Sequence, residues 1–89
     1  MNYTLIIEKG SEAYWGYFPD VPGCATGGAS LEEIVNNAAE ALAGHLEGEA
    51  PPRTRTLAEI LADPEVIEQL DGSELYAPVA YDADRVATV

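Results

Sequence analysis

Few side chains in this chain of 89 residues could carry nucleophilic or acid–base chemistry. It has one histidine, His45, and one cysteine, Cys24. A general base must reach its nucleophile through a hydrogen bond, and no residue of the sequence is singled out as a partner for His45. No basic residue adjoins Cys24 to activate its thiol. We therefore expect a helix-end histidine, a small buried cysteine, no catalytic residue, no metal site and no cofactor.

Acidic residues dominate the charge of the chain. Sixteen Asp and Glu residues oppose four Lys and Arg residues, and the formal net charge is −12. Residues 10–52 hold seven acids and no Lys or Arg, and residues 56–84 hold eight acids and again none. Such a surface repels phosphate backbones and attracts basic proteins. We expect no direct nucleic-acid ligand; the charge favours either a basic protein partner or simply solubility.

Length and hydropathy bound the class of protein. The length suffices for one domain, residues 1–89, and a hydrophobic fraction of 47% is typical of a folded chain. Apolar stretches fall far short of the roughly 20 residues that cross a membrane, and no signal-peptide pattern is present. A single cysteine excludes an internal disulfide. We expect a cytoplasmic protein without a membrane contact.

The first third of the sequence predicts an antiparallel hairpin and a short return strand. Residues 3–8 and 13–18 alternate in strand fashion around a Gly-containing turn at residues 9–12. Pro22 sets φ at one position of the next turn, and Gly23 can take positive φ. Residues 24–26 then form a third strand, which we expect to end at Gly27-Gly28.

Ser30 and Glu33 predict where the main helix begins. They have capping-box spacing, in which each side chain bonds the backbone N–H of the other residue. An apolar stripe follows at helical spacing, and its members are Leu31, Ile34, Val35, Ala38, Leu42 and either His45 or Leu46. Two prolines at residues 51–52 cannot continue the helix.

The second half predicts two short helices and a fourth strand. Cap patterns place the helices at about residues 57–62 and 64–70, and alternation places the strand at residues 75–81. Because Pro78 cannot donate a hydrogen bond to a neighbouring strand, we expect this strand at a sheet edge. Residues 82–89 form a turn and a tail that either frays or pairs with another copy. The fold class is α+β: a three-stranded antiparallel sheet plus a fourth strand, with one main helix on one face.

Several side chains could contact a partner. Trp15, Tyr17 and Phe18 divide between core and surface by strand alternation, and those off the helix-packed face are candidate anchors. Tyr14, Phe18, Ile6 and Tyr76 have the parity to lie near one another. Asp20 favours an Asx turn, with an acidic contact as the alternative. Glu32 and Glu40 form either a solvated helix face or charges that steer a basic partner.

A long ordered run carries a family resemblance. It comprises residues 14–24, Thr26-Gly27-Gly28, residues 30–33, Asn37-Ala38, Ala41-Leu42 and His45-Leu46. This run resembles the N-terminal domain of HicB-like antitoxins, whose fold looks like a partial RNase H. The resemblance implies a protein that neutralises a small basic HicA-type, mRNA-cleaving ribonuclease by binding it.

The resemblance also bears on DNA binding and on two alternative functions. Family members that regulate transcription usually carry a further DNA-binding segment, whereas this sequence ends at Val89, so we expect no operator binding. One rival is a residual RNase H-like nuclease whose metal ions are held by Glu8, Glu33 and Asp82, which requires all three at one sheet edge. Another is a stand-alone oligomeric protein- or ligand-binding module. We expect a homo-oligomer.

Overall fold

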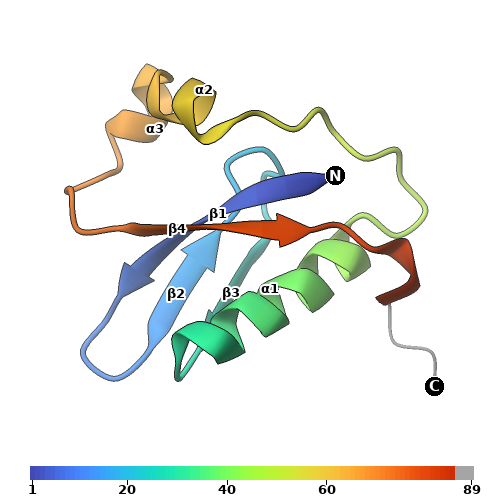
Figure 1. The fold of residues 1–89 in the computed structure, drawn as a ribbon, viewed down its shortest axis with the longest axis horizontal. Coiled ribbons are helices and arrows are strands. Elements are labelled where there is room, and N and C mark those ends of the chain that lie inside the picture. The colour runs from blue at the N-terminus through green and yellow to red at the C-terminus, as the bar shows by residue number, and fades with distance from the viewer. Residues whose placement is uncertain (86–89) are drawn as a thin grey trace.

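The computed structural model describes residues 1–85. Four strands form one antiparallel sheet in the order β3-β2-β1-β4, and the main helix packs on it (Figure 1). This confirms the predicted α+β class. In chain order the elements are β1 (Asn2–Lys9), β2 (Tyr14–Tyr17), β3 (Ala25–Gly28), α1 (Leu31–His45), α2 (Leu57–Leu61), α3 (Pro64–Ile67), β4 (Leu75–Ala80) and a 3-10 turn (Ala83–Arg85).

The third strand lies slightly later in the chain than the sequence predicts. It includes both Gly27 and Gly28, which we expected to end it. A Cβ atom on Gly28 would lie 2.6 Å from the backbone nitrogen of Ile34, so β3 passes against the first turn of α1. Only glycine allows this close approach. Gly23 takes the predicted positive φ, at 85°.

Helix α1 begins at the predicted cap, although only half of the capping box forms. Ser30 accepts a hydrogen bond from the Glu33 backbone N–H at 3.1 Å, but among the described residues the Glu33 carboxylate accepts none from the Ser30 backbone N–H. Leu31 is 42% exposed, and Leu46 rather than His45 completes the buried stripe. The stripe therefore starts one turn later than predicted.

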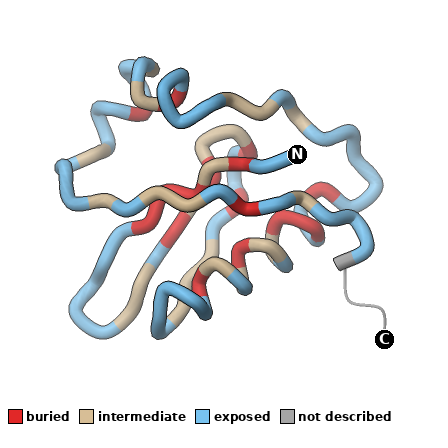
Figure 2. The backbone as a smooth tube through the Cα atoms, in the orientation of Figure 1, coloured by how far each residue is buried: buried red, intermediate tan, exposed pale blue. Residues whose placement is uncertain are grey.

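The sheet buries side chains on both faces. Tyr3, Leu5 and Ile7 pack toward α1, whereas Ile6 packs against Ile60 and Val66 on the other side. Figures 1 and 2 show α1 on one side of the sheet, the α2–α3 pair on the other, and buried residues concentrated along β1 and α1. The expectation that four residues share one face was wrong. Cross-strand register places Ile6 with Tyr17 and Tyr76, while Tyr14 and Phe18 belong to the α1 side.

Both edges of the sheet are interrupted. The Tyr81 backbone N–H donates to the Met1 carbonyl, so alternation along β4 turns the backbone of Pro78 outward, where its missing N–H leaves a gap in the edge donors. On β3, the Asn37 side chain of α1 donates to the Gly27 carbonyl at 2.9 Å. The predicted edge position of Pro78 is confirmed. The predicted tail comprises residues 82–89, of which residues 83–85 form the 3-10 turn. Residues 86–89 lie outside the described residues, so the pairing of the tail stays a prediction.

Candidate protein-binding surface

The sheet face away from α1 is only partly covered. Residues 49–70, here called the arm, carry α2 and α3 across one end of it, above Ile6 and Tyr17. The part that the arm leaves open over β2 and β3, here called the open face, comprises Glu8, Trp15, Ala25, Gly27 and, at the border with the arm, the partly buried Tyr17. Trp15 is 63% exposed there. An apolar ring of this size, exposed on a rigid strand, is a candidate anchor for a protein partner.

Trp15 lies flat against the neighbouring strand. Register pairs it with Gly27 on β3 and with Glu8 on β1. A Cβ atom on Gly27 would lie 2.9 Å from two carbon atoms of the indole ring, so the glycine makes room for the ring. The ring lines a shallow hollow of about 320 Å³. In this structure it therefore packs over Gly27 while most of its surface stays open.

A second hollow adjoins the first. It has a volume of about 430 Å³ and lies between the turn after β2 and helix α3. Tyr17 and Ala25 line both hollows, and the second also has Val66, Glu65 and Gln69 in its wall. The two hollows thus share Tyr17 and Ala25 and run from Trp15 to α3, where the wall holds Glu65, Gln69 and the ion-paired Arg55 and Asp63.

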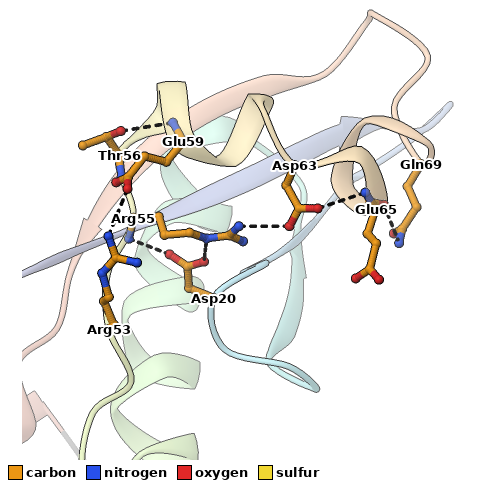
Figure 3. Close-up of polar contacts among 8 residues, drawn as sticks. All are labelled: Asp20, Arg53, Arg55, Thr56, Glu59, Asp63, Glu65 and Gln69. Atoms are coloured by element: carbon orange, nitrogen blue, oxygen red, sulfur yellow. Dashed lines mark hydrogen bonds and ion pairs between the residues drawn. The ribbon is translucent and has the colours of Figure 1, made fainter.

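Arg55 fastens the arm to the sheet (Figure 3). Its Nε donates to Asp20 Oδ1 at 2.5 Å, its backbone N–H donates to Asp20 Oδ2 at 2.8 Å, and its Nη1 donates to Asp63 Oδ2 at 2.9 Å. One residue therefore joins the turn after β2, the start of the arm and the junction between α2 and α3. The Tyr3 hydroxyl adds a hydrogen bond to the Pro52 carbonyl.

The charges of this cluster stabilise one another. Hydrogen bonds from Arg55 to Asp20 and then to Asp63 raise the pKa of the guanidinium. The pKa of Asp63 is lowered, first by the hydrogen bond from Arg55 and next by the backbone N–H of Glu65. Both changes favour the charged forms at neutral pH. The ion-paired cluster of Asp20, Arg55 and Asp63, here called the clasp, therefore holds the arm against the sheet.

Two predicted partner contacts are placed in the interior. Phe18 is 2% exposed and belongs to the core under α1. The Asp20 side chain is 4% exposed, and its carboxylate bonds Arg55, 35 residues away, instead of a neighbouring N–H. Neither side chain is available to a partner in this conformation: Phe18 takes the core position that alternation had left open, and the Asx turn expected at Asp20 does not form. Arg55 is one of only four Lys and Arg residues in a chain with sixteen acids. The sequence could therefore have indicated that Arg55 pairs with a carboxylate.

The other predicted contacts lie on two different sides of the sheet. Trp15 and Tyr17 belong to the open face, whereas Glu32 and Glu40 are exposed on α1. A small globular partner that covers one side does not reach the other. These four assignments stay predictions, and the geometry divides them into an aromatic pair and an acidic pair.

The three carboxylates of the nuclease hypothesis do not converge. Glu8 stands opposite Trp15 at one end of β1, while Asp82 follows Ala80, the partner of Asn2 at the other end. Six residues of strand separate Asn2 and Glu8, or about 20 Å. Among residues 1–85, no group of three or more His, Cys, Asp or Glu side chains could hold a metal ion. That nuclease arrangement is therefore contradicted.

Neither remaining reactive residue type is placed for catalysis. Cys24 is buried, and burial raises the pKa of its thiol. His45 is exposed near the Gly23 turn: a Cβ atom on that glycine would lie 3.5 Å from the imidazole Cε1. In the part of the chain that the structure describes, every helix is too short or too polar to cross a membrane.

Fold and sequence together define a class of small bacterial antitoxin domains. The chain belongs to the family described as "HicB_like antitoxin of bacterial toxin-antitoxin system", whose model matches residues 3–75. An uncharacterized 14.9 kDa protein from the rep-hol intergenic region of Haemophilus phage HP1 is 37% identical over 70 residues, which are 73% of this chain and 53% of that protein. The chain thus spans about half the length of this relative.

Solved structures support the same assignment. The antitoxin HicB of Burkholderia pseudomallei is 26% identical with a TM-score of 0.76, over 98% of this chain and 67% of that one. A chain in the structure of a HicA3 and HicB3 toxin-antitoxin complex is 32% identical with a TM-score of 0.71, over 92% of this chain and 99% of that one. The fold described above is therefore similar to HicB antitoxin domains.

Proposed function

We propose that this chain is an antitoxin that binds and neutralises a small basic HicA-type, mRNA-cleaving ribonuclease. The observation that carries the proposal is the similarity, over 92% of the chain, to a chain of the HicA3 and HicB3 toxin-antitoxin complex. Family membership over residues 3–75 supports the antitoxin role. Neutralisation would proceed by stoichiometric covering of the toxin, without turnover.

The charge of the chain supports a basic partner. Its net charge is −12, and two of its four basic residues, Arg53 and Arg55, are already paired with acids of the arm or the adjoining turn. Opposite charge accelerates encounter with a basic toxin, and the effect weakens as salt rises. The same charge supports the proposal that this chain does not bind nucleic acid directly. We also propose that it acts in the cytoplasm, because a toxin that cleaves mRNA would meet its substrate there.

We place the principal toxin contact on the open face. Trp15 and Tyr17 supply apolar area there, and Glu8 supplies charge beside them. Buried aromatic residues contribute most to interface affinity, whereas peripheral charges mainly set the association rate. Glu32 and Glu40, on the α1 side, therefore serve in steering. Homo-oligomerisation remains a separate proposal, and the interrupted sheet edges weigh against pairing through β4.

Co-expression tests the proposal. The protein encoded by the adjacent reading frame, which we expect to be short and basic, is expressed in bacteria with and without this chain, and growth and co-purification are measured. We expect growth arrest by the toxin alone, rescue by the chain, and a complex that salt weakens. Rescue without a complex, or no rescue at all, would contradict the proposal. Magnesium-dependent RNA cleavage by the purified chain would contradict the non-enzymatic mechanism.

A further inference from the structure

The hollow beside Trp15 combines an exposed aromatic ring with a carboxylate that has no ion-pair partner among the described residues. One side of the indole ring lies against Gly27, yet Trp15 is 63% exposed, so the ring presents an open surface. Glu8 stands directly across from it on β1. Among the described residues, Glu8 takes part in no ion pair. The site thus has an exposed aromatic ring and a free carboxylate at its side.

The surroundings of the hollow are negative as well. Glu8 and Glu74 both act on the Tyr17 phenol and, after burial, raise its pKa. The Glu74 carboxylate is held in place by the backbone N–H groups of Asp71 and Gly72, at 2.9 and 3.0 Å. The lining of the hollow itself contains one charged residue, Glu8. No cation of that lining opposes it.

We infer that this hollow receives an arginine side chain of the protein partner, with the guanidinium stacked on the Trp15 ring and paired with Glu8. The inference rests on the proposed function and adds the chemistry of one contact to it. Arginine suits the site because its guanidinium is planar, stacks on indole and also bonds a carboxylate. A nucleic-acid base could stack on the same ring, but Glu8 would repel its phosphate.

A peptide titration tests the subsite without a toxin. Trp15 is the only tryptophan of the chain, so its fluorescence reports this position alone. The probes are acetylated hexa-arginine amide, the matching hexa-lysine peptide and a hexa-uridine RNA. We expect a saturable fluorescence change with hexa-arginine, weaker binding of hexa-lysine and no response to the RNA. Equal binding of both peptides, or a response to the RNA, would overturn the assignment of arginine.

Two charge-matched variants separate the subsite from general attraction. Glu8→Gln and Glu47→Gln each remove one negative charge, the first beside Trp15 and the second in the exposed turn after α1. We expect Glu8→Gln to weaken hexa-arginine binding about threefold to tenfold and Glu47→Gln to change it less than about twofold. Equal weakening would overturn the subsite. Trp15→Leu, followed by calorimetry, should abolish the preference for arginine over lysine; thermal unfolding checks that the variant folds.

The same variants distinguish this inference from the proposed function. If the toxin binds the unmodified chain and both Glu8→Gln and Trp15→Leu with equal affinity, the subsite is wrong and the antitoxin role stands. If no toxin binds but the peptide results are as expected, the cation subsite stands and the HicA-type partner is wrong. A loss of toxin affinity confined to Glu8→Gln and Trp15→Leu supports both.

Discussion

The two faces of the sheet are covered by very different means. The 15-residue helix α1 lies over one face and shares a cluster of eleven buried residues with it, whereas two helices of five and four residues cover part of the other with a buried cluster of three. Arg55 adds an ion-paired clasp where apolar contact is small. Stability therefore resides mainly on the α1 side, which leaves the opposite side for recognition.

The largest test of this difference compares two fully buried side chains. Leu42→Ala removes contacts from the α1 cluster and Ile60→Ala from the arm cluster, and both residues are 0% exposed. We expect losses in unfolding free energy of about 4 kcal/mol for Leu42→Ala and about 2 kcal/mol for Ile60→Ala, because the arm can relax around the smaller side chain. Urea unfolding measures both. Equal losses would show that the two faces are equally rigid.

The second prediction breaks the clasp. Arg55→Met leaves the Asp20 carboxylate, 4% exposed, without its charge partner. We expect a loss of about 2–3 kcal/mol in unfolding free energy, reduced from the cost at a fully buried pair because Arg55 is 24% exposed. Arg53→Met is the control, since Arg53 is 77% exposed in its pair with Glu59 and should not measurably affect stability. Equal losses for both variants would contradict a stabilising role for the clasp.

The third prediction concerns how closely α1 approaches β3. Gly28→Ala would place a Cβ atom 2.6 Å from the Ile34 nitrogen, which forces the helix and strand apart. We expect a loss of about 1–3 kcal/mol. Gly44→Ala is the matched control on α1: its Cβ would meet nothing within 4 Å, and it should stabilise by about 0.5–1 kcal/mol. Melting temperatures that move in opposite directions would support the packing described here.

The smallest expected effect is a pH dependence at Asp63. Its pKa is lowered from 3.8 in the folded chain, so the folded state binds fewer protons than the unfolded state as the pH falls through this window. The stabilisation is fully present above about pH 4 to 5 and is lost as the pH drops below 3.8 toward the folded pKa. The stability difference between the unmodified chain and Asp63→Asn should therefore be larger at pH 6 than at pH 3. A difference that grows toward acid pH would contradict the clasp.

Local patterns in the sequence predicted most of the fold. The Ser30 cap, the positive φ of Gly23 and the edge position of Pro78 follow from chemistry within a few residues, and each was confirmed. The limits of β3 were missed because Gly27 and Gly28 read as strand breakers. In the structure these positions require glycine because the Trp15 ring lies against Gly27 and helix α1 lies against Gly28.

The candidate site was less predictable for a related reason. Alternation along β2 limited which aromatics share a side, but it did not say which side meets α1, so Phe18 was left as a contact candidate. Asp20 was assigned a local turn because its partner, Arg55, is 35 residues distant. Contacts of that range depend on the packing of the arm, which no short pattern contains.

Pro78 and Asn37 also govern what happens when many copies of the chain are crowded together. Cross-β growth requires an unbroken ladder of donors and acceptors along an outermost strand. At the β4 edge Pro78 has no N–H to donate. At the β3 edge the Gly27 carbonyl already accepts a hydrogen bond from the Asn37 side chain. Both outermost strands are therefore incomplete templates for the addition of a further strand.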